Sequence, residues 1–319
     1  MKRILVTGAL GQVGSELVVT LRERYGVDQV AASDLCMPFE DCRAEGLFVR
    51  VDCTDYNVVK QTVEKYQVDT IFHLAALLSA VAEAKPHAAW DVNMGGLYNI
   101  LEVARENRCA VFFPSSIGAF GPTAPMHNTP QDTLQRPTTM YGVTKVAGEL
   151  LCDYYYKRFG VDTRGVRFPG IISTVTKPGG GTTDYAVEMF YAAIRNKRYT
   201  SYLKRGTYLD MMYMPDAIKA AIHLMEADPR RFMHRNSFNV TAMSFEPEML
   251  AAEIRKHIPE FVLDYQIDPM LQAIADSWPN KLDDSCARKE WDWKPDYDLA
   301  SMAEDMFKVL GERYRLGKL

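Results

Sequence analysis

The chain opens on the stretch Arg3-Ile4-Leu5-Val6-Thr7-Gly8-Ala9-Leu10-Gly11-Gln12-Val13-Gly14. It reads as a buried strand, a turn with three spaced glycines and the start of a helix. Such a turn lets a backbone approach phosphates closely, and a helix N-terminus attracts anions, so we expect it to bind the pyrophosphate of a dinucleotide. The expected contact residues are Gly8, Gly11, Gln12, Val13 and Gly14. A glycine-rich turn without a ligand is the alternative, because three glycines alone are a weak signal.

The next expected strand, residues 29–34, ends at Asp34, about 20 residues after Gly14. A carboxylate at this distance accepts hydrogen bonds from both hydroxyls of the adenosine ribose and repels a 2′-phosphate. No arginine follows directly to neutralise such a phosphate. Asp34 therefore favours NAD over NADP, although an aspartate at a strand end can also be simply solvated.

Expected strands and helices alternate through the first half of the chain. Strands are expected at residues 47–51, 70–74 and 110–115, and helices at residues 57–65 and 89–107. This alternation predicts an α/β fold, a doubly wound parallel sheet of the Rossmann type with helices on both faces. We assign residues 1–170 to this NAD-binding body, with further sheet elements near 206–240. Residues 171–319 are expected to form mainly a smaller C-terminal substrate-binding part.

Ligands of such sheets gather at the carboxyl ends of the strands. There the sequence places Asp52, His73 and the run Leu74-Ala75-Ala76. Asp52 is a candidate for the adenine edge, or equally a cap of the following helix. His73 is more readily a structural residue at a strand end than a base.

Composition limits the classes of partner. The 319 residues carry a net charge of −4 without basic runs, so we expect neither nucleic acid nor a membrane surface as partner. The six cysteines and six histidines are scattered, so we expect no disulfide framework and no metal site. The first strand begins almost at Met1, and no apolar stretch reaches the roughly 20 residues that span a bilayer. We therefore expect a soluble intracellular protein without a signal peptide.

A tyrosine and a lysine four positions apart, Tyr141 and Lys145, indicate the chemistry. In a helix they share one face, so the ammonium lies beside the phenol and can lower a pKa that is ordinarily about 10. The tyrosinate formed in this way can act as a base near neutral pH. Ser116, at the end of an expected strand, can hold the substrate oxygen that exchanges a proton with Tyr141. The alternative is an ordinary pair on a solvated helix face.

These motifs resemble those of the extended short-chain dehydrogenase/reductases over nearly the whole chain. The matching residues are Thr7-Gly8, Gly11, Gly14, Asp34, His73-Leu74-Ala75-Ala76, Asn93, Ser115-Ser116, Tyr141, Lys145 and Arg167-Phe168-Pro169-Gly170. The resemblance implies that NAD is the cofactor, bound also by residues 74–76, and that Ser116 positions the substrate oxygen. It implies Tyr141 as the acid/base, and Lys145 as the residue that lowers its pKa and holds the nicotinamide ribose.

The same resemblance makes Asn93 a cofactor-site residue that supports an internal water or a helix kink linked to the proton relay. It further implies a homodimer formed by the helix that carries Tyr141 and by the region 89–107. From the residues alone, these helices show only apolar faces.

Many members of this family act on nucleotide sugars and carry an arginine before an aspartate that contacts the diphosphate. Here that segment reads Leu209-Asp210-Met211-Met212-Tyr213-Met214-Pro215-Asp216, and a leucine cannot neutralise a diphosphate, so we expect a smaller substrate. The stretches 77–79, 178–186 and 277–279 are instead similar to the short-chain type of L-threonine 3-dehydrogenases. This implies NAD-dependent oxidation of L-threonine, with substrate contacts from Ser79, Ser116, Tyr141, Thr182, Thr183, Asp184 and Trp278.

Two other functions remain open. A nucleotide-sugar epimerase or dehydratase would keep NAD tightly bound and recycle it, and a non-enzymatic NAD-binding regulator would need only the cofactor site. Residues 178–186 could also be a surface loop with a helix N-cap at Thr183 or Asp184. The resemblance implies a mitochondrial location in a eukaryote and a cytoplasmic one otherwise.

Overall fold

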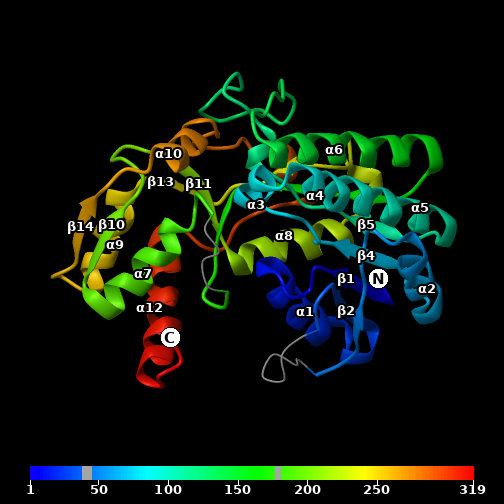
Figure 1. Ribbon diagram of the computed structural model, residues 1–319, viewed down its shortest axis with the longest axis horizontal. Coiled ribbons are helices and arrows are strands. Elements are labelled where there is room, and N and C mark those ends of the chain that lie inside the picture. Colours follow the sequence, from blue (N-terminus) through cyan, green and yellow to red (C-terminus); the bar gives the residue numbers. More distant parts are fainter. Residues whose placement is uncertain (38–44, 177–180) are drawn as a thin grey trace.

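The computed structural model describes residues 1–37, 45–176 and 181–319. Its central element is a six-stranded parallel sheet with the strand order β3-β2-β1-β4-β5-β7 (Figure 1). The strands are β1 (Ile4–Thr7), β2 (Val30–Asp34), β3 (Phe48–Arg50), β4 (Thr70–His73), β5 (Ala110–Phe112) and β7 (Thr163–Arg164). The order reverses direction between β1 and β4, the place where doubly wound sheets bind ligands. The predicted Rossmann-type sheet is confirmed.

Helices cover both faces of this sheet (Figure 1). On one face lie α1 (Gln12–Tyr25) and α8 (Met214–Glu226), and on the other α2 (Tyr56–Tyr66), α5 (Leu97–Asn107) and α6 (Met140–Phe159). The alternation of side chains along β1 shows why both faces are covered. Ile4 and Val6 pack into the apolar core with α1 and α8, whereas Leu5 packs into the core with α2 and α5.

Three smaller sheets extend the molecule. The first contains β12 (Phe238–Asn239), β8 (Val166–Phe168) and β6 (Ser115–Ser116), and the second β13 (Met243–Phe245), β11 (Leu209–Tyr213) and β9 (Gly170–Ile172). The third pairs β10 (Arg198–Ser201) with β14 (Val262–Tyr265). Around the last two lie α7 (Tyr185–Asn196), α9 (Pro247–His257), α10 (Pro269–Asp276) and α12 (Leu299–Arg315), which form the left part of Figure 1.

The chain passes between the main sheet and this second part more than once. A separate apolar core fills the second part and includes Phe190, Phe245 and Leu310. In contrast, α8 and α11 (Ser285–Trp291) pack with the core of the main sheet, to which they contribute Ile222 and Trp291. Because late segments return to the sheet, the boundary after residue 170 stays a prediction.

The helix expected over residues 89–107 is divided in the structure. The segment α4 (Pro86–Trp90) follows α3 (Ser79–Ala84) and leads into a π-helical stretch, η3 (Asp91–Gly96), before α5 begins. A π turn adds only about one residue, a change too small for apolar periodicity to reveal. Such turns often occur at functional sites, and this one contains Asn93.

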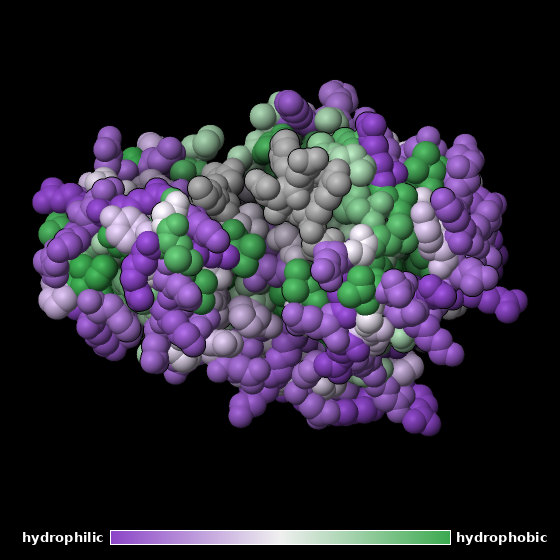
Figure 2. All heavy atoms as spheres, turned by 90° about the horizontal axis from the view of Figure 1, so that it is seen from below, coloured by the Kyte–Doolittle hydropathy of each residue, from purple (hydrophilic) through white to green (hydrophobic). Residues whose placement is uncertain are grey.

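Seen from below, the surface is mainly hydrophilic, and its hydrophobic side chains lie in small groups (Figure 2). Within the three described ranges, no helix has the length and apolar character that a membrane span requires.

Candidate active site

The glycine-rich turn joins β1 to α1 at the carboxyl edge of the sheet. Gly8 has a φ of +70°, and a Cβ added there would lie 2.6 Å from the backbone nitrogen of Ala75. A Cβ added at Gly14 would lie 2.2 Å from the Gly8 carbonyl oxygen, so α1 packs directly on the turn. Gly8 and Gly14 therefore have the tight-turn and close-packing geometry that the sequence predicts.

The first turn of α1 offers unpaired backbone N–H groups. Gly11 occupies the N-cap position with an extended backbone, no side chain caps the helix, and no acidic residue lies in the first turn. The N–H groups of Gln12, Val13 and Gly14 thus have no intrahelical carbonyl partner. A Cβ added at Gly11 would meet only the Gly8 carbonyl oxygen, at 3.2 Å. An uncapped helix start at a glycine, where no side chain stands in the way, fits a pyrophosphate.

Asp34 ends β2 next to this turn. Its carboxylate accepts hydrogen bonds from the backbone N–H of Leu10 at 3.1 Å and of Cys36 at 3.4 Å. The predicted ribose-binding carboxylate therefore lies against the glycine-rich turn, where an adenosine ribose attached to the pyrophosphate would fall.

Asp52 is bound locally. Its carboxylate accepts hydrogen bonds from the backbone N–H of Thr54 at 2.9 Å and from the Thr54 hydroxyl at 2.7 Å. The N-cap of α2 is Asp55, whose side chain accepts two backbone N–H groups of the first turn. The reading of Asp52 as the helix cap is therefore wrong, and its contact with adenine stays a prediction.

Ser116 and Tyr141 come together where β6 meets the first turn of α6. Thr139 caps α6 by accepting a hydrogen bond from the Gly142 N–H at 3.1 Å, which places Tyr141 at the start of the helix. A Cβ added at Gly118 would lie 3.5 Å from Ser116 Oγ and 3.4 Å from Tyr141 Cδ1. The serine hydroxyl and the tyrosine ring therefore flank this one glycine.

Lys145 completes the cluster on the same face of α6. Its Nζ lies 5.5 Å from the centre of the Tyr141 ring and 4.7 Å from the centre of the Phe113 ring. The ammonium donates a hydrogen bond to the Pro114 carbonyl at 2.6 Å. The structure thus brings the three predicted catalytic residues, Ser116, Tyr141 and Lys145, into one cluster.

Burial sets the protonation states of this pair. Burial raises the pKa of Tyr141 to about 12, and its hydrogen bond with Ser116 only partly opposes the change. Burial also lowers the pKa of Lys145 to about 8, against the opposing charge of Glu149. The expectation of a lowered Tyr141 pKa is therefore wrong for this structure, because loss of hydration on burial is the dominant cause.

Asn93 links the loop after β4 to the helix of the Tyr/Lys pair. Its side-chain oxygen accepts the Leu77 N–H at 2.8 Å, and its amide donates to the Leu77 carbonyl and to Thr144 Oγ1, both at 3.1 Å. These hydrogen bonds tie Leu77, the residue after Leu74-Ala75-Ala76, to Thr144 on α6. An internal water at Asn93 stays a prediction, as does the contact of Ser79, the half-buried first residue of α3, with a substrate.

His73, which ends β4, is a structural residue here. Its Nδ1 is hydrogen-bonded to Thr7 Oγ1 at 2.8 Å, and burial lowers its pKa to about 3. The imidazole is therefore neutral at physiological pH and inaccessible to a substrate, which agrees with the structural interpretation of this residue.

The predicted substrate stretch is described from Gly181 onward, and its residues 178–180 lie outside the described ranges. The hydroxyl of Thr182 is buried and has no hydrogen-bond partner among the described residues. Thr183 packs on β9, since a Cβ added at Gly170 would lie 2.6 Å from its Cγ2. Asp184 holds the N-cap position of α7, but its carboxylate accepts the Gly181 N–H at 2.7 Å instead of capping the helix.

Trp278 follows α10 and is buried. It belongs to the same apolar core as Ile117, the residue after Ser116. Its place near the catalytic cluster and its contact with a substrate methyl group stay predictions.

The sequence reasoning missed a buried ion pair behind these residues. Glu149 on α6 and Arg167 on β8 are 4% and 6% exposed. The guanidinium donates to the carboxylate through Nε at 3.0 Å and Nη2 at 2.8 Å. Two sequence features could have pointed to this ion pair: a glutamate one helical turn after Lys145, and an arginine in the family-like stretch 167–170. Nothing in the sequence indicates that these two residues contact each other.

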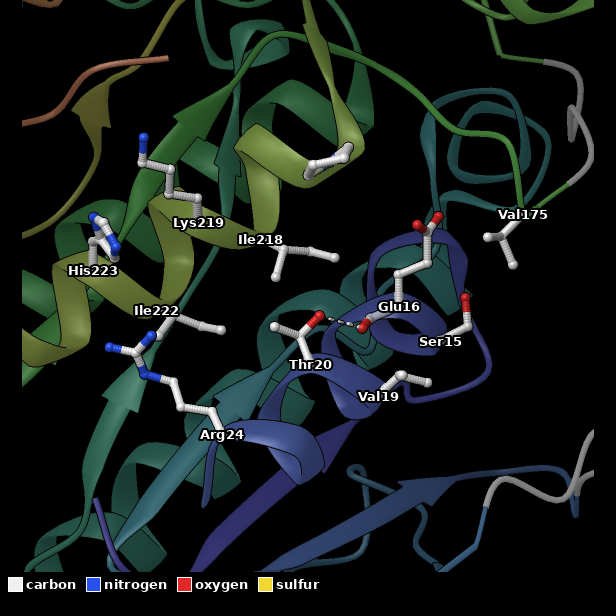
Figure 3. Close-up of a pocket in the computed structure, with 11 residues that line it drawn as sticks. Ser15, Glu16, Val19, Thr20, Arg24, Val175, Ile218, Lys219, Ile222 and His223 are labelled. Atoms are coloured by element: carbon white, nitrogen blue, oxygen red, sulfur yellow. Dashed lines mark hydrogen bonds between the residues drawn. The ribbon is translucent and has the colours of Figure 1, made fainter. Parts of the chain in front are cut away.

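Two other features lie apart from this cluster. A hollow of about 520 Å³ between α1 and α8 is lined in part by Glu16, Ile218 and Ile222, and none of the predicted site residues lines it (Figure 3). His234, Cys286 and Glu290 place potential metal-ligating atoms together. However, His234 Nδ1 and Glu290 Oε1 are hydrogen-bonded at 2.6 Å, and Glu290 Oε2 accepts two backbone N–H groups, so these atoms are satisfied within the protein.

Comparison with known proteins identifies the family. A family model described as the NAD dependent epimerase/dehydratase family matches residues 4–240. A curated relative from Staphylococcus haemolyticus, named an uncharacterized epimerase/dehydratase, is 58% identical over 98% of this chain and 99% of its own.

The chain is also similar to solved structures. The L-threonine dehydrogenase from Clostridium difficile is 59% identical with a TM-score of 0.96, over 98% of both chains. The holo form of the GalE-like L-threonine dehydrogenase from Cupriavidus necator is 47% identical with a TM-score of 0.94, over 97% of this chain and 99% of that one. An L-threonine 3-dehydrogenase from a metagenome, described as monomeric, is 44% identical with a TM-score of 0.93, over 97% and 99%. The uncapped α1, the Ser116, Tyr141 and Lys145 cluster and these matches agree: the chain is an NAD-binding enzyme of the NAD dependent epimerase/dehydratase family.

Proposed function

We propose that this enzyme oxidises the β-hydroxyl of L-threonine to give 2-amino-3-oxobutanoate. The observation that carries the proposal is the clustering of Ser116, Tyr141 and Lys145 in a structure whose α1 begins uncapped after the glycine-rich turn. It occurs in a chain 59% identical, end to end, to a protein described as L-threonine dehydrogenase.

In this reaction the threonine β-carbon loses a hydride and its hydroxyl loses a proton, so that a carbonyl forms. NAD bound against the glycine-rich turn supplies the acceptor for the hydride. Tyr141 takes the hydroxyl proton, and Ser116 donates a hydrogen bond to the same oxygen. The Lys145 ammonium stabilises the tyrosinate form of Tyr141 at a ring-centre distance of 5.5 Å.

The amino-acid end of threonine is assigned to the segment that leads into α7. The hydroxyl of Thr182, which has no partner among the described residues, and the hydroxyl of Thr183 suit the carboxylate, and Asp184 suits the ammonium. Ser79 and Trp278 are proposed to border the pocket, with Trp278 against the methyl group. A buried hydroxyl without a partner is costly, and a bound carboxylate would supply the missing acceptor.

A nucleotide-sugar epimerase or dehydratase is the second candidate, because the curated relative is named an uncharacterized epimerase/dehydratase. Against it, Leu209 stands where such enzymes place a diphosphate-binding arginine, and its side chain is 1% exposed within an apolar core. The next residue, Asp210, is bound to Thr241 Oγ1 at 2.6 Å and to the Leu282 N–H at 2.7 Å. A non-enzymatic regulator is disfavoured because the Tyr/Lys pair is complete.

Spectrophotometry separates these functions. Purified enzyme is mixed with NAD and, in turn, L-threonine, L-serine, 3-hydroxybutyrate and a nucleotide sugar, with NADP in place of NAD as the matched comparison. The NADH absorbance band is expected to grow with threonine and NAD. NAD that stays bound through purification, with no net reduction by threonine, would favour the epimerase.

We also propose that two copies pair through α4, α5 and α6, which lie side by side (Figure 1). Large hydrophobic side chains are exposed along these helices, namely Trp90, Tyr98, Val143, Leu150 and Tyr154. Exposed apolar groups of this size commonly mark protein interfaces. The monomeric relative shows that such a pairing is not universal among similar proteins. The curated relative is bacterial, and the expected mitochondrial location finds no support.

A further inference from the structure

Lys145 is a buried cation whose direct partners carry no negative charge. Lys145 is 5% exposed. Within the described part of the chain, its ammonium contacts the Pro114 carbonyl and the ring faces of Phe113 and Tyr141. An ammonium in such a place readily loses its proton. A negatively charged group that does not contact the ammonium is therefore needed to keep Lys145 protonated.

Glu149 lies one turn further along α6 and is held in place from several sides. Its carboxylate accepts two hydrogen bonds from Arg167, at 3.0 Å and 2.8 Å, and one from Gln135 at 3.0 Å. It also accepts the Ser115 hydroxyl. Arg167 is fixed in turn by the Gln131 carbonyl at 2.8 Å and by Asn239 Oδ1 at 3.1 Å. With so many donors, the carboxylate has a single position.

Lys145 and Glu149, one turn apart on α6, also bind the segment that carries Ser116. Lys145 binds the carbonyl of Pro114, and Glu149 binds the side chain of Ser115, the next residue. The following residue is Ser116, whose hydroxyl lies beside the Tyr141 ring. Any shift of Glu149 would therefore be passed to the serine that faces the tyrosine.

We propose that Glu149, clamped by Arg167, is a positioning residue that keeps Lys145 charged and holds Ser116 against Tyr141. This role rests on the proposed oxidation. It also assigns a function to Arg167. Glu149 touches neither the proposed substrate nor the cofactor, so it acts through its neighbours.

Electrostatics supports the placement. The groups around Lys145 are His73 on β4 and Tyr141, Glu149 and Cys152 on α6, while Arg167 on β8 reaches them through Glu149. His73 is neutral, and Glu149 raises the Lys145 pKa against the lowering effect of burial. Removal of the Glu149 charge should therefore lower the pKa of Lys145 below its value of about 8.

The test measures the Lys145 pKa directly, by NMR titration of enzyme labelled with 13C at the lysine ε-carbon. The Lys145 signal is the one missing from Lys145→Arg. Glu149→Gln keeps the shape of the side chain and removes its charge, and the Lys145 pKa should fall by about one unit. Glu290→Gln is the matched control, because Glu290 is equally buried but belongs to the His234 pair on α11.

An unchanged Lys145 pKa in Glu149→Gln would overturn the electrostatic half of the proposal. If that variant does not fold, Glu149→Gln/Arg167→Gln removes both buried charges together. Because the loss of the Arg167 charge offsets part of the loss of the Glu149 charge, a smaller fall in the Lys145 pKa is expected, and no fall would overturn the electrostatic half. The titration uses no substrate. If the wild-type enzyme does not oxidise threonine but Glu149→Gln shows this fall in the Lys145 pKa, the proposed function fails and the electrostatic role of Glu149 stands.

Ser115→Ala tests the positioning half. It deletes one hydrogen bond to Glu149 and keeps every charge, so kcat should fall while the KM for NAD and the Lys145 pKa stay at their wild-type values. Wild-type kcat in Ser115→Ala would overturn the positioning role.

Discussion

Tyr141 carries the chemistry at the scale of single residues. Tyr141→Phe keeps the ring beside Gly118 and removes the hydroxyl, so kcat should fall by about 10²- to 10⁴-fold, the usual effect of losing a general acid or base. The NAD dissociation constant, measured by calorimetry, should stay near wild type because the glycine-rich turn is untouched. A variant that keeps more than about half of the wild-type rate would exclude Tyr141 as the base.

The protonation states of the same cluster predict the pH dependence. The reactive form needs Tyr141 without its proton and Lys145 with its proton, and their pKa values are about 12 and about 8. Below the lower value, the reactive population grows about tenfold per pH unit; between the two values, gain of tyrosinate and loss of ammonium cancel. A profile of kcat/KM should therefore rise through neutral pH and level off near pH 8. A rate that is constant between pH 6 and pH 8 would contradict this assignment.

At the scale of elements, the segment that leads into α7 is the part of the site with the least support from geometry. Thr182→Ala/Thr183→Ala removes both hydroxyls that we assign to the threonine carboxylate. The KM for threonine should rise or kcat should fall, while NAD affinity stays near wild type because α1 and Asp34 are unchanged. Unaltered threonine kinetics would place the amino-acid site around Ser79 and Trp278 instead.

The elements that the sequence predicted well are those with local signals. The strand β1, the glycine-rich turn and α1 follow from apolar runs and glycine spacing, and their alternation with later elements gave the sheet type. The sequence did not predict the division of the helix around Asn93 or the capping of α2 by Asp55, because each depends on a shift of one or a few residues.

Contacts between distant elements could not be read from local patterns. Glu149 and Arg167 lie on α6 and β8, and only the fold joins them into an ion pair. The raised pKa of Tyr141 has the same origin, because burial depends on the whole environment of the ring and not on the spacing to Lys145.

At the scale of the whole molecule, the proposed pairing of two copies gives a direct prediction. Leu150→Asp puts a charge among the exposed hydrophobic side chains of α6. Met270→Asp on α10 is a matched control, since Leu150 and Met270 are each 64% exposed. Sedimentation should show a dimer for the wild type and for Met270→Asp, and a monomer for Leu150→Asp. A monomeric wild type would remove the proposed pairing and leave the catalytic account unchanged.

The central claim, hydride removal from the β-carbon of threonine, has one most direct measurement. The enzyme is incubated with NAD and L-threonine that carries deuterium on the β-carbon, and the cofactor is analysed by mass spectrometry. The account predicts reduced cofactor that contains the deuterium, formed together with 2-amino-3-oxobutanoate or its decarboxylation product. Cofactor that stays oxidised, or reduced cofactor without deuterium, would contradict the account.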